Sequence, residues 1–444
     1  MTKTKTKVLL VQPNYDIDNI STGRSNPAWM PLALVELATY VNENGHVSKI
    51  FDRNLYPNDE DFIKILEEFK PDIVGLTCYT SKVIKDVLNV AFLTHEYSNS
   101  IYVIVGGIHA TLEPQSLLDI PDIDYVIRGE GERPLLEICN LIQNEGVDEI
   151  SQVPNVNHNE EYPLMDLNEL PIPDYGLIEV PKYCMTTFST SRGCMGACKF
   201  CYNRGRRLRF YDTDKMIKMM TGVIEKYKIK EFTIADDNFA TFGERTDKIC
   251  EALSKYKCIF HCFMRADQAT EEVIKNLKKA GCWDIQFGFE SGSQRILDFI
   301  NKRTTVEQNI NALKLCKKYG IFVDGSFVIG FPGETEADLV YTTHFIKKYK
   351  PDAVNINLFK PFPHTEFYDL CMAQNKIKQP ETLEDWISFC DINAGEPNFS
   401  NIPTKTLLEL STALNKRSLW LKAKKFILLC LRGHAGYAFS RLKK

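Results

Sequence analysis

Apolar runs and amphipathic stretches alternate along the first 150 residues. Lys7–Pro13 is a short apolar run that ends at a proline, and Pro31–His46 then carries Leu34, Leu37 and Val41 at helical spacing before its end. Further strand-like runs, most of them followed by helical patterns, read VSKIFD, DIVGLTCYT, YVIVGGIHAT and YVIRGEGE. Strand and helix patterns that alternate on this scale predict an α/β domain with a doubly wound, mostly parallel sheet over residues 1–150.

Ligands of such sheets bind beyond the carboxyl ends of the strands, where the strand order reverses. The candidate loops lie at residues 12–15, 77–81, 106–111 and 128–132. Gly106 and Gly107 would let the backbone approach a large ligand closely. Taken alone, however, this pair of glycines is more typical of a tight turn.

Residues 151–182 differ in character, because they are rich in proline, asparagine and acidic residues and show no sustained period. This composition indicates an interdomain linker. A second alternating series follows, with strand-like runs at 185–191, 231–235, 258–264, 284–289, 322–330 and 353–359. Between them lie helical patterns, one of which begins near Thr304 and Glu307 at the spacing of a capping box.

Six successive strand–helix units predict a partial parallel barrel over residues 183–365, with its active site on the loops at the carboxyl ends of the strands. Residues 366–444 are expected to form a small, mainly helical segment. Its tail is basic and amphipathic, and Trp420, Phe426 and Leu429 are among the residues that would dock it on the barrel. Alternatively, the tail lies on a membrane surface and points to a lipid substrate.

The bulk composition changes this picture little. A chain of 444 residues is expected to form two or three domains, and 44% hydrophobic with 25% charged residues is typical of soluble globular proteins. A net charge of −4 gives no reason to expect a nucleic-acid partner. Fourteen cysteines without paired spacings, no readable signal peptide and no long apolar run favour a cytoplasmic chain with reduced thiols.

The stretch SRGCMGACKFCYN places Cys194, Cys198 and Cys201 in a C-x3-C-x2-C spacing. These residues would follow the first strand of the second series, on the face where barrel folds do chemistry. A structural zinc site normally needs a fourth Cys or His nearby, and the next candidates, Cys184 and His158, precede that strand. Three unrelated buried thiols are the other simple explanation.

Soft thiolates grouped on one loop suit an iron–sulfur cluster, and such clusters usually have four thiolate ligands. With only three, one iron is left open to bind a reactant. Gly193, Gly196 and Ala197 suggest a loop that wraps closely around something bulky.

This motif, with Phe200 before its last cysteine and at the start of a six-unit barrel, resembles the radical S-adenosylmethionine (SAM) superfamily. The resemblance covers roughly residues 183–365. It implies a [4Fe–4S] cluster on the three cysteines, with the amino and carboxylate groups of SAM on the unique iron. Reduction of the cluster then cleaves SAM to a 5′-deoxyadenosyl radical, and an electron donor such as flavodoxin or ferredoxin is an implied partner.

Further segments resemble the SAM contacts of this superfamily in the expected order. In IADDNFATF, Asp236, Asp237 and Asn238 would lie near the SAM amino group, and in FMRAD, Arg265 would meet the SAM carboxylate. Simple alternatives exist for each, since the acidic segment could cap a helix and the arginine could form a surface ion pair.

Two later segments complete the implied SAM site. In FGFESGS, Glu290 would contact the ribose and Ser291 would assist, and in FVIGFPGET, Val328 would pack beside adenine. Phe200 is a further implied SAM contact. No catalytic side chain beyond the cofactors is implied. His364 stands where relatives often have glycine in a PFPGT turn, which suggests a turn variant.

The first 180 residues resemble the Rossmann-like cobalamin-binding domain that is fused ahead of many radical SAM barrels. The implied cobalamin contacts are Gln12, Asn14, Tyr15, Thr77, Tyr79, Thr80, Gly106, Gly107, His109, Thr111, Gly129 and Glu130. Many such domains carry D-x-H-x-x-G after the first strand, whose histidine binds cobalt from below, but this sequence has QPNYDIDNISTG there. The lower cobalt face is therefore expected to be open or approached by another residue, and His109 resembles a packing or phosphate-side residue.

The two resemblances together imply methylation of an unactivated carbon of a small-molecule substrate, such as a natural product or a lipid. Cyclisation, ring contraction or another rearrangement with the same cofactors is the alternative within the enzymes. A non-catalytic cobalamin or redox sensor is the alternative from another class. Methylthiotransferases that modify tRNA carry further cluster cysteines in the N-terminal domain, where this chain has only Cys78 and Cys139.

Overall fold

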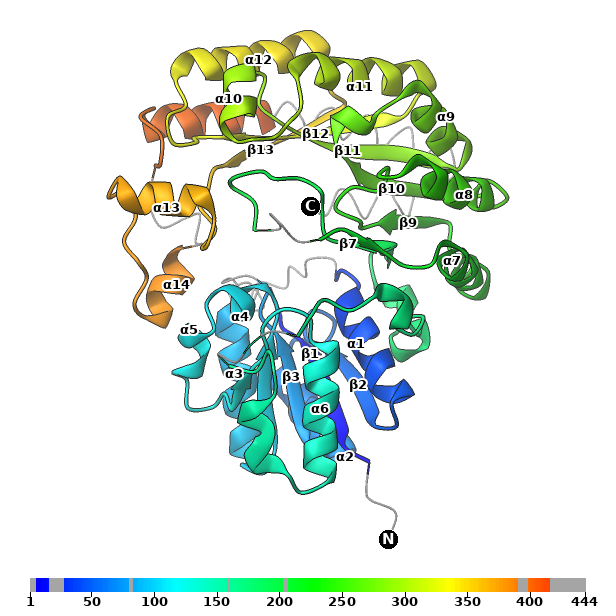
Figure 1. Cartoon of the computed structure of the whole chain (residues 1–444), viewed down its shortest axis with the longest axis vertical. Helices are drawn as coiled ribbons and strands as arrows, with labels where there is room; N and C mark the ends of the chain where they lie inside the picture. The colour runs from blue at the N-terminus through cyan, green and yellow to red at the C-terminus, as the bar shows by residue number, and fades with distance from the viewer. Residues whose placement is uncertain are drawn as a thin grey trace. The chain divides into compact units, whose positions relative to one another are not determined.

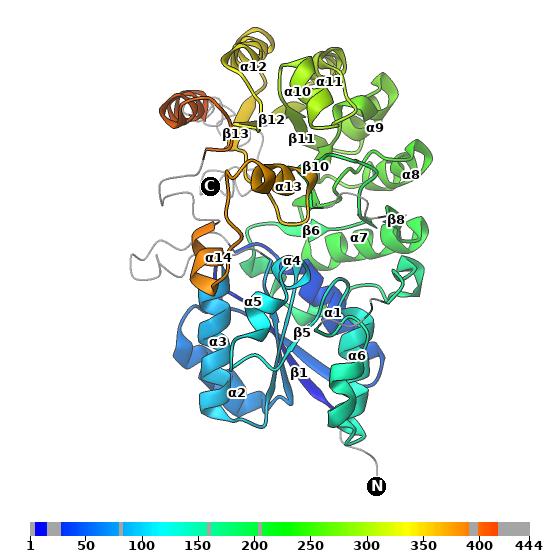
Figure 2. The same ribbon diagram turned by 60° about the vertical axis from the view of Figure 1, so that its left-hand side comes forward.

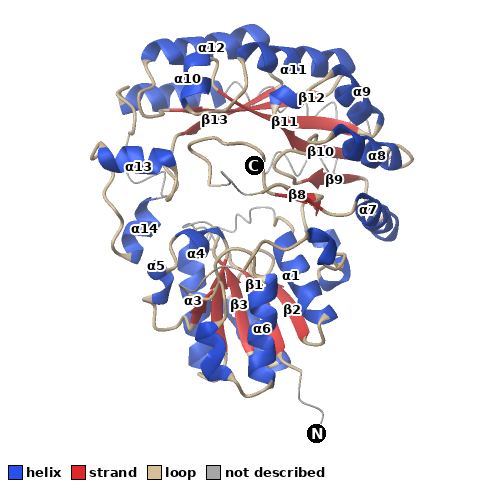
Figure 3. Cartoon of the chain, viewed as in Figure 1, coloured by secondary structure: helices blue, strands red, loops and turns tan. Residues whose placement is uncertain are grey.

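The computed structural model describes residues 5–15, 28–79, 83–157, 160, 162–202, 207–389 and 398–415. The chain forms two compact units. The first consists of Met1–Cys184 and Gln379–Ala394, and the second of Met185–Lys378 and Gly395–Lys444. Each unit has a parallel sheet of its own with helices packed against it (Figures 1 and 3). The segment 366–444 is thus divided between the two units.

The sheet of the first unit has five parallel strands in the order β2-β1-β3-β4-β5. Their bounds are Lys7–Gln12 (β1), Val47–Asp52 (β2), Ile73–Thr77 (β3), Tyr102–Gly106 (β4) and Tyr125–Val126 (β5). β1 pairs with both β2 and β3, so the strand order reverses beside it. The carboxyl ends of β1 and β3 are therefore the place where such a sheet binds a ligand.

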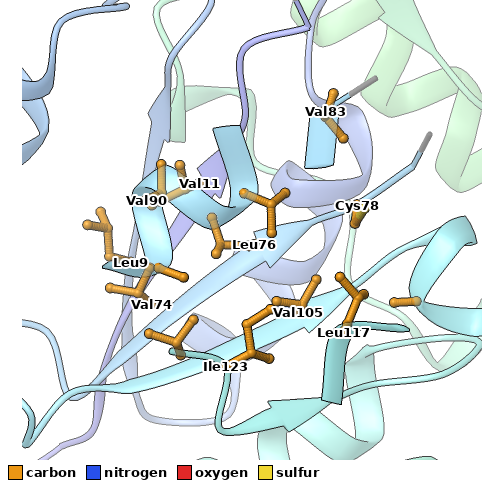
Figure 4. Close-up of a cluster of buried hydrophobic side chains, with 14 of the residues drawn as sticks. Leu9, Val11, Val74, Leu76, Cys78, Val83, Val90, Val105, Leu117 and Ile123 are labelled. Carbon is orange, nitrogen blue, oxygen red and sulfur yellow. The ribbon is translucent and has the colours of Figure 1, made fainter. Parts of the chain in front are cut away.

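Alternate residues of β1 face opposite layers of helices. Val8 and Leu10 belong to a core with α1 (Leu32–Glu43) and α6 (Glu132–Gln143). Leu9 and Val11 face the other layer, which is shown in Figure 4. That layer contains α2 (Asp59–Phe69), α3 (Ile84–Tyr97), α5 (Gln115–Leu118) and α14 (Leu383–Phe389). Because both faces are buried, the strand is apolar throughout, as parallel strands between two layers usually are.

The remaining elements of the first unit are short. Helix α4 spans Ile108–Leu112, and four 3₁₀ turns cover Val147–Gln152, Leu167–Glu169, Tyr175–Leu177 and Val180–Lys182. Trp386 of α14 is 4% exposed and belongs to the same buried cluster as α2 and α3. The first unit therefore includes a helix that is contributed from far along the chain.

Six parallel strands form the sheet of the second unit, in the order β13-β12-β11-β10-β9-β6. Their bounds are Thr186–Phe188 (β6), Glu231–Ile234 (β9), Ile259–Met264 (β10), Cys282–Glu290 (β11), Phe322–Ile329 (β12) and Ala353–Leu358 (β13). Each strand pairs with its neighbours in chain order, and the two edge strands do not pair with each other in the part of the chain that is described. The fold class predicted from the sequence, a doubly wound domain followed by a partial (β/α)6 barrel, is confirmed.

Helices cover the outer face of this sheet, as Figure 2 shows. They are α7 (Thr213–Tyr227), α8 (Gly243–Leu253), α9 (Glu271–Lys279), α10 (Gln294–Phe299), α11 (Val306–Tyr319) and α12 (Glu336–Tyr349). Helix α13 (Glu366–Ala373) lies apart from this row, and its Phe367 N–H donates to the Lys199 carbonyl at 3.4 Å. Stacked and tilted phenylalanine rings fill the layer between strands and helices, for example Phe289 against Phe327 and Phe345. No helix of the described ranges is both long enough and apolar enough to cross a bilayer.

The capping box predicted at Thr304 and Glu307 is wrong by one residue. Helix α11 is capped by Thr305, whose hydroxyl oxygen accepts from the Gln308 amide N–H at 3.1 Å, while Gln308 Oε1 accepts from the Thr305 N–H at 2.8 Å. Thr304 is only 3% exposed. It is therefore part of the packed interior, and the next threonine takes the cap.

Candidate functional site

The loop with the three predicted cluster ligands is closed at its base by a short antiparallel ribbon. Its two strands are β7 (Ser191–Arg192) and β8 (Arg209–Phe210). Cys194, Cys198 and Cys201 lie between them, and none of the three forms a disulfide. The loop therefore presents three thiols at the carboxyl end of β6.

Gly196 lies between the first two thiols. A Cβ atom at this position would be 3.3 Å from Cys194 Sγ, 3.9 Å from Cys198 Sγ and 3.5 Å from Arg265 Nη1. The Gly196 N–H also points to Cys194 Sγ, at 3.3 Å. Because glycine has no side chain, a space bordered by two thiols and a guanidinium stays open, as a bulky inorganic group would need.

The segment that follows α10 holds the cluster loop in place. The Lys199 N–H donates to the Ile300 carbonyl at 3.0 Å. The Asn301 side chain donates to the Ala197 carbonyl at 2.9 Å. The shape of the loop is thus fixed from outside, by a segment about a hundred residues later in the sequence.

Asp236 anchors the start of the cluster loop. Its side chain is fully buried, and Oδ1 accepts from the backbone N–H groups of Thr190 at 2.6 Å and Ser191 at 3.2 Å. Oδ2 accepts from the Thr190 hydroxyl and from Arg245 Nη2, the latter at 3.3 Å. Burial lowers the pKa of Arg245, and the neighbouring carboxylate opposes this effect. With four protein donors, the Asp236 carboxylate is engaged in holding the loop.

Asn238 and Arg265 form the next layer of contacts. Asn238 Oδ1 accepts from the Arg265 backbone N–H at 3.1 Å. The guanidinium of Arg265 grips Asp267 through Nε at 3.0 Å and Nη2 at 3.1 Å, and Nη2 also donates to the Lys302 carbonyl at 2.7 Å. Burial works against the charge of Arg265, but the hydrogen bonds to Asp267 outweigh it and raise its pKa. Asp237 is exposed.

Glu290 ends β11 in a left-handed conformation, with φ of 60°. The register with β12 shifts between Gly288 and Glu290, and such a bulge redirects a side chain. Glu290 Oε1 accepts from Lys302 Nζ at 2.7 Å, and the two side chains are only 10% and 8% exposed. A Cβ at Gly288 would be 2.5 Å from Glu290 Oε1 and 3.0 Å from Lys302 Nζ, so a larger residue here would have to displace this pair.

The charged side chains around Glu290 and Arg265 influence the pKa of the Cys198 thiol. Burial raises the pKa of Cys198, the charges of Lys302 and Arg265 lower it, and those of Glu290 and Cys194 raise it, with a raised pKa as the result. Iron binds the thiolate, so nearby cations favour the form of the cysteine that a metal needs.

The other predicted SAM contacts lie at the carboxyl ends of β11 and β12. Ser291 is buried, and its hydroxyl is 3.1 Å from Thr342 Oγ1 of α12. Phe200 packs edge-on against Phe331, with ring centroids 5.4 Å apart. Val328 is half-buried on β12. Ser291 therefore ties a strand end to a helix, and the other two line apolar positions.

No three His, Cys, Asp or Glu side chains converge on the position of a single metal ion within the described ranges. A [4Fe–4S] cluster makes a different demand, because each thiolate binds a separate iron at the corner of a cube. Three soft donors on one loop, with a glycine-lined space between two of them, fit such a cluster.

In the first unit, a buried ion pair holds the loop after β1. Arg53 Nε lies 2.9 Å from Asp86 Oδ2, and both side chains are almost fully buried. Asp86 Oδ2 also accepts from the Asn14 backbone N–H at 2.6 Å. Gln12 is half-buried at the end of β1, and Tyr15 packs against the unit's apolar cluster. The three predicted contacts of this loop therefore start from a rigid base.

The loops after β3 and β4 approach each other through their backbones. Thr77 is paired with Gly106, and the Cys78 N–H donates to the Gly106 carbonyl at 2.7 Å. Gly107 has φ of 103°, and a Cβ there would lie 2.8 Å from the Cys78 carbonyl oxygen. Tyr79 follows, and burial raises the pKa of its hydroxyl well above the usual value. Gly107 thus meets a steric demand of both loops, whereas a Cβ at Gly106 would approach no atom closer than 3.7 Å.

Thr111 links the loops after β4 and β5. Its hydroxyl donates to the Gly107 carbonyl at 2.8 Å and accepts from the Gly129 N–H at 2.9 Å. Glu130 beside it is half-buried. The predicted contacts therefore gather at the carboxyl edge of one sheet. Thr80, His158 and the tail from residue 416 lie outside the described residues.

His109 is a neutral, buried imidazole. Burial lowers its pKa to about 4, and Nε2 lies 3.0 Å from the Ser116 hydroxyl. Ser116 gives its one proton to the Glu113 carbonyl at 2.7 Å, so it accepts from His109 Nε2–H and leaves Nδ1 as the acceptor of the ring. The imidazole also meets Trp386 edge-on, with ring centroids 5.6 Å apart.

Cys78 and Cys139 of the first unit do not form a metal site together. Cys78 belongs to the apolar cluster with α2 and α3, and Cys139 belongs to the cluster on the opposite face of the sheet. Both are fully buried, and burial raises the pKa of Cys139 to about 12. A second cluster of the methylthiotransferase kind has no ligands in these two residues.

Comparison with known proteins identifies both units. The sequence profile of the radical SAM superfamily matches residues 188–346, and that of the B12-binding domain matches residues 20–139. The chain is also 33% identical over 392 residues to an uncharacterized methyltransferase of Pyrococcus horikoshii, in a match that covers 84% of each protein. The chain belongs to the cobalamin-binding radical SAM family. The predicted family, its enzymatic nature and its three cofactors, a [4Fe–4S] cluster, SAM and cobalamin, are therefore confirmed.

Other members of this family give a wider view of its reactions. The chain is 28% identical to the anaerobic magnesium-protoporphyrin IX monomethyl ester cyclase of Rubrivivax gelatinosus, over 82% of this chain and 69% of that protein. The radical SAM methyltransferase TsrM of Kitasatospora setae, solved with cobalamin and a [4Fe–4S] cluster bound, shares the fold. Its TM-score is 0.70, at 17% identity, over 84% of this chain and 75% of that one.

The motifs of the cobalamin-binding radical SAM family did not point to several residues that contact the predicted site. Lys302 was not singled out, although it pairs with Glu290. Arg245 and Thr190 were missed as partners of Asp236, and Trp386 as a neighbour of His109. The one signal for Lys302 in the sequence is its place between the apolar residues of 296–300 and those of 306–313, and this signal is not specific.

Proposed function

We propose that this chain transfers a methyl group to an unactivated carbon of a small molecule. When bound, the reduced cluster supplies the electron that cleaves SAM to a 5′-deoxyadenosyl radical, and cobalamin supplies the methyl group. The observation that carries the proposal is the space at Gly196, which two thiols and Arg265 border. Three thiolates beside a guanidinium suit a cluster with one open iron and a ligand that brings its own carboxylate.

The cluster and the SAM carboxylate are assigned first. Cys194, Cys198 and Cys201 hold the iron atoms. Arg265 receives the carboxylate through Nη1, because Asp267 already holds Nε and Nη2 and so fixes the direction of the guanidinium.

The rest of SAM is assigned to the ends of β9, β11 and β12. Glu290 receives the ribose hydroxyls through the carboxylate oxygen that Lys302 does not bind. Phe200 and Val328 serve the adenine side. Asp237, which is exposed, is assigned as a contact of the SAM amino group. The side chains of Asp236, Asn238 and Ser291 are already engaged by the protein, so they are assigned as positioning residues.

Cobalamin is assigned to the carboxyl edge of the first unit's sheet. The close backbone approach at Gly107, the neutral His109 and the buried Tyr79 suit a large ligand with an uncharged, amide-rich rim. The remaining contacts follow from the same four loops: Gln12, Asn14, Tyr15, Thr77, Thr80, Gly106, Thr111, Gly129 and Glu130. Asp86 holds the start of the loop after β1 at Asn14, and the sequence QPNYDIDNISTG has no histidine, so we expect cobalt to be open below or approached by another residue.

The functional division of the chain follows from these assignments. Residues 1–150 bind cobalamin, 151–182 connect, 183–365 bind the cluster and SAM, and 366–444 form the C-terminal segment. The substrate is a small molecule, with a natural product or a lipid as the finer proposal. The electron donor is a low-potential protein such as flavodoxin or ferredoxin, and the protein works in the cytoplasm. The basic tail is proposed as a docking helix, with membrane contact as its alternative.

Cyclisation or another rearrangement is the second candidate reaction. The cyclase relative at 28% identity favours it as an alternative, because that protein is named for ring formation. A cobalamin or redox sensor is the candidate from another class, and it would bind the cofactors without turnover.

One anaerobic experiment separates these functions. The reconstituted, reduced protein is incubated with SAM labelled in its methyl group. Candidate substrates are compounds of the pathways whose genes neighbour the gene of this protein. Label in the product together with 5′-deoxyadenosine supports methyl transfer, and 5′-deoxyadenosine with an unlabelled product supports rearrangement. A protein with cluster and cobalamin but without any 5′-deoxyadenosine would contradict both reactions and support a sensor.

A further inference from the structure

Lys302 contacts two of the assigned SAM residues at once. Its ammonium donates to Glu290 Oε1 at 2.7 Å, and its backbone carbonyl accepts from Arg265 Nη2 at 2.7 Å. The residue is only 7% exposed. A lysine with so little exposure is unusual, because burial penalises its charge unless a partner offsets the cost.

The backbone around Lys302 is strained. Asn301 has φ of 52° and Arg303 has φ of 57°, so two residues with side chains adopt the left-handed conformation on either side of it. This conformation is strained for a residue with a side chain, and it persists only where surrounding contacts impose it. Here the contacts of Ile300 and Asn301 with the cluster loop impose it. In this strained conformation, Lys302 lies beside the cluster loop and also reaches Glu290.

Lys302 also lies beside the predicted cluster ligands. The preceding residue, Asn301, donates to the carbonyl of Ala197, next to Cys198, at 2.9 Å. The Lys302 carbonyl holds Arg265, whose Nη1 borders the space between Cys194 and Cys198. One-electron reduction of a [4Fe–4S] cluster adds one negative charge to it. A buried cation beside a cluster thiolate stabilises this more negative state, and the charge around a cluster is among the features that set its potential.

We propose that Lys302 is a positioning residue with two effects: it fixes Glu290 for the SAM ribose, and it raises the reduction potential of the cluster. The electron comes from the low-potential one-electron donor named above, and no bond to Lys302 forms or breaks. This inference rests on the proposed function for the identity of the cluster and for the ligand of Glu290. A purely structural ion pair is the alternative, and it would affect only the stability of the protein.

The first test compares Lys302→Met with Lys302→Arg in the full-length, anaerobically reconstituted protein. Iron and sulfide content, the cluster midpoint potential from a redox titration followed by EPR, and the dissociation constant of SAM are measured. We expect Lys302→Met to shift the potential to more negative values and to weaken SAM binding roughly tenfold. Lys302→Arg keeps the charge, so its potential stays close to that of the parent, while its longer fork weakens SAM binding by a smaller factor.

Lys318→Met is the matched control. Lys318 also pairs with a glutamate, Glu271, but both of these side chains are more than half exposed. Its removal is expected to leave the cluster potential and the SAM affinity unchanged. A shift of equal size in Lys318→Met would show that any lysine of the chain has this effect, and it would overturn the proposal.

A second pair of variants, Glu290→Gln and Glu290→Gln/Lys302→Met, separates the two effects. The double variant leaves neither charge buried without a partner, so it folds even if Lys302→Met alone does not. We expect equal SAM affinity in the two proteins, because Lys302 acts on SAM only through Glu290. The potential of the double variant is expected to be the more negative of the two, because the charge of Lys302 is absent from it.

The outcomes distinguish this inference from the proposed function. Equal potentials in Glu290→Gln and Glu290→Gln/Lys302→Met, in proteins that hold the cluster, overturn the role of Lys302 and leave the proposed function intact. A parent protein that holds no [4Fe–4S] cluster overturns both.

Discussion

The carboxyl edges of the two sheets are built from different kinds of contact. In the second unit, charged pairs surround the cluster loop: Asp236 with Arg245, Arg265 with Asp267, and Glu290 with Lys302. In the first unit, the loops after β3, β4 and β5 meet through backbone contacts at Gly107 and through neutral side chains such as His109. Its buried ion pair, Arg53 with Asp86, lies under the start of the loop after β1, where Asp86 accepts from the Asn14 backbone N–H.

This difference matches the ligands that the two edges are proposed to bind. A small zwitterion and a charged inorganic cluster need fixed charges at fixed distances. A large ring with an amide rim needs access to the backbone and polar groups that stay neutral. The site on the second unit should therefore be sensitive to single charges, and the site on the first unit to single changes of shape.

The largest expected effect comes from the cluster ligands. Cys194→Ala, Cys198→Ala or Cys201→Ala removes one of three thiolates, so SAM cleavage is lost while cobalamin stays bound. The amount of 5′-deoxyadenosine and the visible absorption of bound cobalamin measure the two effects in the same sample. Cys184→Ala, outside the motif, is the control and should keep cleavage. Retained cleavage in any of the three motif variants contradicts the ligand assignment.

A smaller but still large effect is expected from the anchor of the cluster loop. Asp236→Ala leaves the buried Arg245 without its carboxylate and removes the acceptor of Thr190 and Ser191. The loss is about 3 kcal/mol or more of the free energy of unfolding, with reduced iron content after reconstitution. Asp237→Asn, at the exposed neighbouring position, should change the free energy of unfolding by less than about 0.5 kcal/mol. Equal losses in the two variants, in anaerobic thermal unfolding, would remove the anchor role.

On the cobalamin side, the test is one of shape. Gly107→Ala places a Cβ about 2.8 Å from the Cys78 carbonyl oxygen at a φ of 103°. We expect a loss of roughly 2 kcal/mol in stability and weaker cobalamin binding in a spectroscopic titration. Gly222→Ala is the matched control, because Gly222 lies exposed within α7 with nothing near its Cβ. That change should stabilise the protein by about 0.5–1 kcal/mol. A Gly107→Ala protein as stable as Gly222→Ala would contradict the close backbone approach.

The smallest effect expected at neutral pH comes from the titration of His109, which affects stability only as the pH falls. Burial lowers its folded-state pKa to about 4, below the ordinary value of 6.5. Between these values the unfolded chain binds the proton and the folded chain does not, so stability falls as the pH drops from 6.5 towards 4. His109→Phe keeps an aromatic ring beside Trp386 and removes the titration. Thermal unfolding from pH 4 to 7 should show a flatter dependence for this variant, and an unchanged slope would rule out a neutral buried His109.

Local patterns predicted the fold class well, because strand and helix patterns are written in short stretches of sequence. The three cluster ligands, which stay a prediction, were read from one such stretch. The C-x3-C-x2-C spacing fixes three thiols on one loop whatever surrounds them. The glycines that the fold requires, Gly107 and Gly196, stood inside motifs that could be read directly. His364, which replaces a glycine of related turns, indeed has φ of 60°.

Contacts between distant segments could not be predicted in the same way. Lys302 meets Glu290 only because β11 and the segment after α10 are brought together by the barrel. Asp236 was expected near SAM, but its carboxylate is enclosed by Thr190, Ser191 and Arg245, and no local pattern shows such a network. The cap of α11 moved by one residue for a similar reason, since the burial of Thr304 depends on tertiary packing.

The central claim is that one iron of the cluster has no protein ligand and is free to bind SAM. EPR spectra of the oxygen-free, reduced protein, recorded before and after SAM is added, test it most directly. The account predicts a [4Fe–4S]⁺ signal whose g-values change when SAM binds. A zinc ion in place of iron, or a cluster signal that SAM leaves untouched, would contradict it.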